Sequence, residues 1–459
     1  RCCVLRDLVD VAQPWKAGWV SEHPIDLSTR IIDSGTADTP VNRMTEEVSE
    51  LGDGIAIVES FSHSVLVDTG AGLVAFDTSV EAKGAAVVEA ARTWSDAPFD
   101  TLVYTHGHLD HVGGSGAFAA DAEAKGHGAP RVVGHEKVAP RFGSYRDTSG
   151  YNRVINLRQF GGAATDMAKA TERPFLPPSV LEPDTTYRDQ LTVDIGDTAF
   201  EFNHCLGETD DHTWTWIPKH KMIAAGDQFI WMFPNCGNPQ KVQRYPLEWA
   251  ASLRDMAAKE PELFVPAHGL PIAGADRIRT CLITVAETLE KLVTDVVDAM
   301  NTGAVLDEIV HSVSVSPEIL EIPYLRPAYD EPEFVIRNIW RLYGGWYDGN
   351  PSRLKPPSDQ AVGTEIVDLI GDIQVIVDRA IQRSAEGDHR LACHLIELAV
   401  AAEPESRAAN EARVQIYQTR RSVETSLMAK GIYKGAAADS QAAITGEIPD
   451  SKFVLDITS

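Results

Sequence analysis

The sequence is short of positive charge, of paired cysteines and of long apolar runs. Its 41 lysines and arginines stand against 67 aspartates and glutamates, which gives a formal net charge of −26. Nucleic acids and anionic membrane surfaces need a basic face that displaces their counterions, so this balance argues against both as partners. No stretch approaches the roughly 20 apolar residues of a membrane-spanning helix. The start has no signal-peptide pattern and no initiator methionine, so we expect a processed or trimmed N-terminus.

Six cysteines are spread thinly over the 459 residues, and none belongs to a Cys-x-x-Cys pair. A disulfide framework is therefore not expected, and the composition favours a reducing, cytoplasmic location. Cys205 follows His204 and precedes a turn, where it could act as a nucleophile or a ligand. A buried structural thiol is the commoner outcome for such a position.

The length predicts two to three domains, and 44% hydrophobic residues are enough for a packed core. Residues 1–50 resemble an irregular arm interrupted by prolines. After them, short β-rich runs at 55–58, 64–67 and 73–76 predict successive strands, and the alanine-rich run 82–94 predicts a crossover helix.

Four potential metal ligands lie within six residues. They follow a short apolar run, 101–104, that predicts a buried strand, and they precede a Gly-Gly pair that predicts a turn into a helix. The motif is His106-Gly-His108-Leu-Asp110-His111. Residues two apart can clasp one metal while the adjacent Asp110 and His111 face another, and this ligand set suits Zn²⁺ and its first-row neighbours. The alternative is a loop that is rich in histidine by chance.

This motif resembles that of the metallo-β-lactamase superfamily, whose members share an αββα sandwich with a one- or two-metal site at its edge. The resemblance implies further ligands: Glu208 in a turn where histidine is usual, and Asp227 and His268, each after an apolar strand. Asp77 matches a family aspartate that hydrogen-bonds to the metal loop, although an ordinary strand-end cap is the alternative. The implied set is His106, His108 and Glu208 for one metal, Asp110, His111 and His268 for the other, and Asp227 between them.

An insertion, about 115–195, separates the first two motifs and carries arginines, tyrosines and an asparagine in loop-like sequence. One interpretation is an anion pocket, because guanidinium presents a planar donor fork to sulfate, phosphate or carboxylate. The other is a solvated, salt-bridged surface. The candidate substrate-binding residues here are Tyr145, Tyr151, Asn152 and Arg153.

The aromatic segment 228–235 directly follows Asp227. It could line an apolar substrate channel. Equally, it could belong to the core or to a subunit contact.

Beyond His268 the pattern becomes helical, with apolar residues at helical spacing over 277–300 and 363–435 and a tetratricopeptide-like pair around 385–404. Together with a Tyr-Gly-Gly-Trp-Tyr-Asp-Gly-Asn-Pro run at 343–351, this resembles the alkyl sulfatases, which also carry glutamate in the second motif. The resemblance covers residues 45–437. It implies a helical dimerisation domain and a homodimer, with Trp340, Trp346 and Tyr347 as core or interface candidates.

Three departures separate the sequence from that family. Asp227 stands where that family has a bridging glutamate. The Leu-Arg-Gly stretch, whose arginine binds sulfate in that family, is absent, so Lys241 or Arg244 would have to take its place. Little sequence follows the predicted helices, so we do not expect the sterol-carrier-like C-terminal domain that is usual in that family. The fold inference survives these departures, whereas a long-chain alkyl sulfate substrate does not follow.

The prediction is an α/β chain: an arm (1–50), an αββα catalytic domain (51–285), an all-α tetratricopeptide-like domain (286–437) and a tail (438–459). We expect a hydrolase that uses a water molecule activated by two divalent metal ions and oriented by Asp110. Zinc is the preferred metal, and the ligand set is also compatible with manganese or iron. The substrate is a small molecule, anionic or with an apolar chain. An alkyl sulfatase-type sulfuric ester hydrolase is preferred. The alternatives are hydrolysis of a lactone, carboxylic ester or phosphoester, and a non-enzymatic scaffold.

Overall fold

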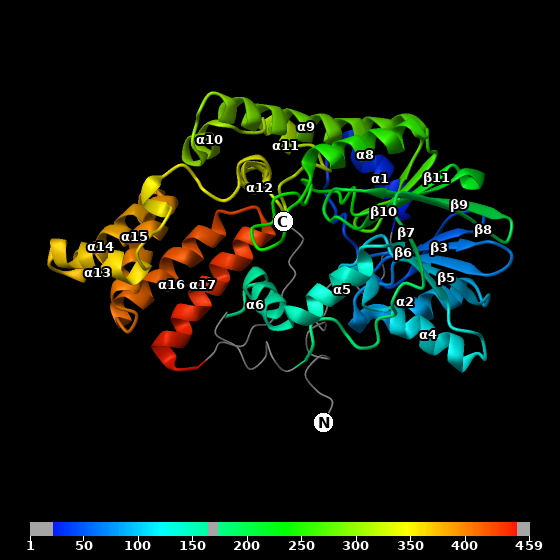
Figure 1. Ribbon diagram of the computed structural model, residues 1–459, viewed down its shortest axis with the longest axis horizontal. Helices are drawn as coiled ribbons and strands as arrows, with labels where there is room; N and C mark the ends of the chain where they lie inside the picture. The colour runs from blue at the N-terminus through cyan, green and yellow to red at the C-terminus, as the bar shows by residue number, and fades with distance from the viewer. Residues whose placement is uncertain (1–21, 164–172, 448–459) are drawn as a thin grey trace.

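The structure is a computed structural model that describes residues 22–163 and 173–447. Two β-sheets pack face to face and carry helices on their outer faces (Figure 1). The first sheet has the order β1-β2-β3-β4-β5-β6-β7 and the second β13-β12-β11-β10-β9-β8. The strands are β1 Val48–Gly52, β2 Ile55–Val58, β3 Ser64–Asp68, β4 Leu73–Phe76, β5 Phe99–Val103, β6 Arg131–His135, β7 Thr185–Tyr187, β8 Gln190–Ile195, β9 Thr198–Cys205, β10 His212–Ile217, β11 Met222–Gly226, β12 Leu263–Pro266 and β13 Ile272–Ala273.

The central strands, such as β2 and β4, are buried on both faces because side chains of alternate residues serve two different cores. In β2, Ile55 and Ile57 enter the core between the sheets, together with Phe200 and Phe202 of β9. Ala56 points to the opposite face, in the core that includes helix α2 (Glu81–Trp94). Strands covered on both sides are expected to be apolar at nearly every position. The predicted αββα sandwich is confirmed.

Helices α8 (Pro246–Ala258) and α9 (Ala275–Asn301) cover the second sheet. The predicted arm is wrong in part: residues 24–34 form helix α1, which packs its buried Leu27 and Ile31 into the same core. Residues 1–21 lie outside the described residues. Pro24 is tolerated there because it stands in the first turn, where its missing N–H is not needed.

The loop expected around 141–158 is helical in the structure. Helices α5 (Val138–Asp147) and α6 (Ser149–Gln159) follow one another there. Glycines and a proline lower the local helix preference, but Pro140 lies in the first turn and Phe142 and Ile155 are buried. Burial of one face therefore outweighs local propensity.

The rest of the chain forms a second, all-helical part beside the sandwich (Figure 1). The predicted helix pair is confirmed as α14 and α15, which pack with α16 and α17 around a core of small and branched side chains. Two predicted domain boundaries fall inside helices, 285/286 in α9 and 437/438 in α17. The remaining helices are α3 Leu109–Val112, α4 Ser115–Ala124, α10 Leu306–Ser312, α11 Pro317–Leu320, α12 Pro332–Gly344, α13 Asp359–Ile370, α14 Ile373–Ala385, α15 His389–Ala402, α16 Arg407–Ser422 and α17 Leu427–Thr445, with short 3-10 turns at Pro218–His220 and Pro351–Arg353.

Helix α17 ties the helical part to the sandwich by packing on α6. A Cβ atom on Gly431 would lie 1.6 Å from the main-chain oxygen of Gln159, so only glycine allows this approach. Within the described ranges, no helix is long and apolar enough to cross a membrane.

Candidate metal centre

The histidine loop begins where β5 ends and is held by Asp77 at the end of β4. Thr105 donates to both carboxylate oxygens of Asp77, from its main-chain nitrogen at 2.9 Å and its hydroxyl at 2.8 Å. The second oxygen also lies 2.7 Å from Nδ1 of His111. This bond fixes the ring so that its Nε2 faces the site. Asp77 is therefore more than a strand-end cap.

The first ligand group is formed by two residues of that loop and by the turn after β9. Nε2 of His106 lies 2.8 Å from Nδ1 of His108. Oε1 of Glu208 lies 3.6 Å from the same Nδ1. The three atoms fall within 4.8 Å of one another, so a single divalent cation could bind all of them.

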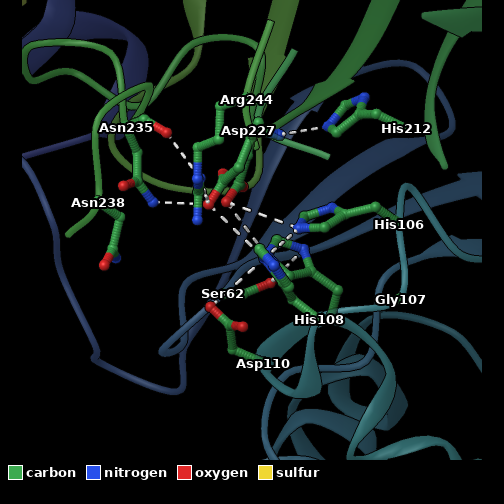
Figure 2. Close-up of polar contacts among 12 residues, drawn as sticks. Ser62, His106, Gly107, His108, Asp110, His212, Asp227, Asn235, Asn238 and Arg244 are labelled. Atoms are coloured by element: carbon green, nitrogen blue, oxygen red, sulfur yellow. Dashed lines mark hydrogen bonds and ion pairs between the residues drawn. The ribbon is translucent and has the colours of Figure 1, made fainter. Parts of the chain in front are cut away.

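The second group gathers Asp110, His111 and His268, also within 4.8 Å of one another. Oδ2 of Asp110 is 3.3 Å from Nε2 of His268 and 3.5 Å from Nε2 of His111. Asp227 stands between the two groups, with Oδ2 at 3.4 Å from Nε2 of His111 and at 4.0 Å from Nε2 of His106 (Figure 2). The structure thus brings together the seven residues predicted from the sequence.

The chemistry of these side chains fits divalent metal ions. Three buried ligand atoms lack a hydrogen-bond partner among the described residues: Nε2 of His111, Oε2 of Glu208 and Oδ1 of Asp227. Buried polar atoms are rarely left in this state. Burial lowers the pKa of His111, yet the carboxylates of Asp227 and Asp110 outweigh it and raise this pKa well above its usual value. The site therefore attracts positive charge to a point where histidine nitrogens converge, as expected of a metal site.

Glu208 forms an ion pair with a buried arginine. Oε1 of Glu208 lies 2.5 Å from NH1 of Arg244 and accepts a hydrogen bond of 2.6 Å from Nδ2 of Asn235. Burial raises the pKa of Glu208 to about 8 in spite of Arg244. Full ionisation at neutral pH therefore needs a further positive charge beside this carboxylate. NH1 of Arg244 also donates to the main-chain oxygen of Asn235, so this guanidinium group holds Glu208 in place.

Lys241, the other predicted substitute for a sulfate-gripping arginine, has no partner for Nζ among the described residues and is half-buried. Burial and the nearby Arg244 lower its pKa to about 8, while Asp110 and Glu208 oppose the shift. The ammonium group is therefore within electrostatic range of the metal ligands.

The structure separates the four candidates of the insertion. Tyr145 on α5 lies near the site, since burial raises the pKa of its hydroxyl to about 12 and the charges of Arg141, Asp211 and Asp110 all act on it. Tyr151 on α6 is 63% exposed. Asn152 is buried and donates to Thr148 within the helical segment. Arg153 is half-buried on α6.

The segment 228–235 is core rather than a channel wall. Phe229, Ile230, Trp231 and Phe233 are each at most 6% exposed. Trp231 and Phe229 contact each other edge to face, and Nε1 of Trp231 donates to the main-chain oxygen of Leu270. This packing fixes the chain immediately after Asp227.

Two contributors were missed by sequence reasoning. Arg141 of α5 donates to Asp211 at 2.8 Å, and the same carboxylate oxygen accepts from the main-chain nitrogen of Gly107 between the first two histidines. Tyr329 comes from the link before α12. Its hydroxyl accepts a hydrogen bond of 2.6 Å from Gln159. Burial raises the pKa of this hydroxyl, and the charges of Glu208, Arg244 and Asp110 also affect it. Neither had a local signal, because each reaches the site through a tertiary contact.

Comparison with known proteins agrees with this architecture. The model of the metallo-beta-lactamase superfamily matches residues 57–268, and the model of the alkyl sulfatase dimerisation family matches residues 305–442. The chain is thus a metallo-β-lactamase-fold protein with a second, helical domain. Its two domains are those of the metallo-beta-lactamase superfamily and of the alkyl sulfatase dimerisation family, which confirms the alkyl sulfatase-like resemblance noted in the sequence.

A linear primary-alkylsulfatase of Pseudomonas sp. is 24% identical over 400 residues, which cover 83% of this chain and 75% of that protein. An (R)-specific secondary-alkylsulfatase of Pseudomonas sp. is 25% identical over 77% of this chain and 55% of its own length. The solved structure of a stereoselective inverting sec-alkylsulfatase from Pseudomonas sp. superposes with a TM-score of 0.75 at 20% identity. That likeness covers 87% of this chain and 66% of the other, and it shows the shared fold. The chain thus spans between about half and three quarters of the length of these relatives.

Proposed function

We propose that this protein is a sulfuric ester hydrolase of the alkyl sulfatase type that works with two divalent metal ions, zinc in the first instance. The observation that carries the proposal is the convergence of His106, Asp227 and five other ligands in two adjoining groups. The relatives named as alkylsulfatases support a sulfate ester as substrate. A non-enzymatic scaffold would not need buried ligand atoms that lack partners.

The bound metals would supply a water of lowered pKa, from about 16 toward 7, and would polarise the ester oxygen. Asp110 is the protein group that we assign to orient the attacking water, because its side chain is 25% exposed and projects into the site. His111 is held in one orientation by Asp77, and Glu208 is held by Arg244 and Asn235. These two ligands are thereby held in position before substrate binds, which limits the reorganisation that the reaction requires.

We assign recognition of the anionic sulfate to Lys241, with Tyr145 and Tyr329 as hydroxyl donors near the site. Nζ of Lys241 has no partner among the described residues, and the charges of Asp110 and Glu208 affect its pKa, whereas NH1 of Arg244 is paired with Glu208. Charge-assisted hydrogen bonds to an anion are about twice as strong as neutral ones, so a half-buried ammonium group beside the site is well suited to this task.

The test is release of inorganic sulfate from primary and secondary alkyl sulfates of increasing chain length by the zinc-loaded protein. Asp110→Ala is the control variant, and release that disappears in it supports the proposal. If a protein holding two metals releases no sulfate, sulfate ester hydrolysis is refuted. The same preparation then goes to lactones, carboxylic esters and phosphoesters, the second class that Asp227 and the missing Leu-Arg-Gly stretch leave open.

We also propose a homodimer that forms through the helical domain. The description of the family that matches this domain supports it, and so do large apolar side chains at its surface. Trp346 is 70% exposed and Leu369 is 74% exposed, whereas Trp340 is half-buried and donates to the main-chain oxygen of Tyr347. Light scattering should give twice the chain mass at micromolar concentration, and a monomer would overturn the proposal. A reducing location remains a prediction, in keeping with the free cysteines among the described residues.

A further inference from the structure

His212 is completely buried next to the metal centre but belongs to neither ligand group. It is the first residue of β10, and its exposed fraction is 0%. Its imidazole stacks on that of His106, with ring centroids 5.0 Å apart and planes inclined by 25°. Figure 2 shows it joined to Asp227 at the end of the cluster away from Asp110.

The hydrogen bonds of His212 define which nitrogen carries the proton. Nε2 lies 3.0 Å from the main-chain nitrogen of Asp227. A main-chain N–H can only donate, so Nε2 accepts and the proton of the neutral ring is on Nδ1. Nδ1 faces Sγ of Cys205 at 3.6 Å, and that sulfur also accepts from Nε2 of Gln228 at 3.0 Å.

The backbone at Asp227 is shaped to meet this ring. Gly226 has φ of +57°, and a Cβ atom on it would lie 2.7 Å from Nε2 of His212. The backbone turn before Asp227 therefore packs directly against the imidazole of His212. From the other side, Thr213 donates to the main-chain oxygen of Thr105 at 2.6 Å, so β10 is also fastened to the residue before His106.

We propose that His212 is a positioning residue of the metal centre. It holds the main-chain amide of Asp227 through Nε2, and its ring lies beside that of His106. One side chain thereby sets the position of the bridging carboxylate relative to the first histidine motif. The inference rests on the proposed two-metal site but not on which ester is hydrolysed.

Two substitutions separate the acceptor from the rest of the ring. Glutamine at this position can place its carbonyl oxygen where Nε2 stands and accept from Asp227. Asparagine reaches only the position of Nδ1, on the side of Cys205. Metal affinity is measured by competition of the purified protein with a chromophoric chelator for zinc, and the geometry of the centre is followed by the visible absorption of the cobalt-loaded protein.

We expect His212→Asn to weaken zinc binding by about 10- to 100-fold and to change the cobalt spectrum, whereas His212→Gln stays within about threefold of the parent, as for other residues that orient metal ligands. Circular dichroism checks that each variant is folded. Cys205→Ala removes the partner of Nδ1 without touching Asp227, so it should bind zinc nearly as the parent does.

Three outcomes would overturn the assignment. Parent-like zinc affinity in a folded His212→Asn would show that the bond to the amide of Asp227 positions nothing. A loss in His212→Gln as large as in His212→Asn would assign the effect to the ring and not to its acceptor. An equal loss in Cys205→Ala would assign it to core packing. Since zinc affinity is read directly, these outcomes are independent of whether the protein releases sulfate.

Discussion

Replacing Lys241 with methionine should make the protein more stable and a poorer enzyme. Burial and Arg244 lower the pKa of Lys241 from 10.5 to about 8, so the folded state carries this charge at neutral pH against its environment. Each unit of pKa difference between the folded and unfolded states corresponds to 1.36 kcal/mol, and the charge therefore costs the fold about 3 kcal/mol at pH 7. Methionine removes the charge and keeps an unbranched side chain of similar length.

The sign of the pH dependence follows from the direction of the shift. Because the folded-state pKa is depressed, the penalty is absent above the unfolded value of 10.5 and grows as pH falls toward 8. Lys241→Met should therefore gain up to about 3 kcal/mol over the parent in urea unfolding at pH 7, but only about 1 kcal/mol at pH 10.

The same substitution removes the proposed partner of the sulfate group. A hydrogen bond between charged groups contributes about 1.5–3 kcal/mol, so kcat/KM for an alkyl sulfate should fall about 10- to 100-fold, chiefly through KM. The parent should lose affinity for the anion as pH rises through about 8, and the variant should not. The matched control is Lys219→Met, since Lys219 is 42% exposed and pairs with Asp197 at the surface. Unchanged stability together with unchanged KM in Lys241→Met would refute the reasoning.

Two further predictions concern the supports of the site. Gly431→Ala should force α17 away from Gln159 and lower both the free energy of unfolding and the activity. Gly435→Ala is the control and should lower them much less, because a Cβ atom there would lie 3.1 Å from its nearest neighbour. Urea unfolding and kcat/KM test this, and equal effects of the two substitutions would contradict it. Asp77→Asn should weaken metal binding by about 10- to 100-fold because His111 loses the carboxylate that orients it. Chelator competition measures that change, and parent-like affinity would argue against it.

The histidine motif could be predicted from the residues themselves, and the resemblance to the superfamily implies the other metal ligands, each of which lies after an apolar strand or in a tight turn. His106 to His111 form one continuous motif, and Asp227 and His268 follow strands that are apolar throughout. The chain order of such strand ends is visible without coordinates. The αββα layering is implied by the same resemblance, and it agrees with central strands that are apolar on both faces.

The supports of those ligands could not be predicted, because they depend on which distant segments meet. The sequence offers Arg244 as a substitute for a sulfate-binding arginine, and only the fold shows that it pairs with Glu208. Tyr329 reaches the site from the link to the helical domain, and Gln159 holds it from a segment expected to be a loop. The aromatic residues after Asp227 are equally compatible with a channel and a core, and packing against α8 and α9 decides for the core.

The most direct test of the central claim is a titration of zinc into metal-free protein, with bound zinc and released sulfate recorded on the same samples. The structure predicts tight binding of two equivalents, sulfate release from an alkyl sulfate that appears as the sites fill, and no release from Asp110→Ala. Binding of less than about one equivalent would contradict the account, because the proposal assigns the two adjoining ligand groups to two ions. Sulfate release that persists without metal, or that survives in Asp110→Ala, would contradict it equally.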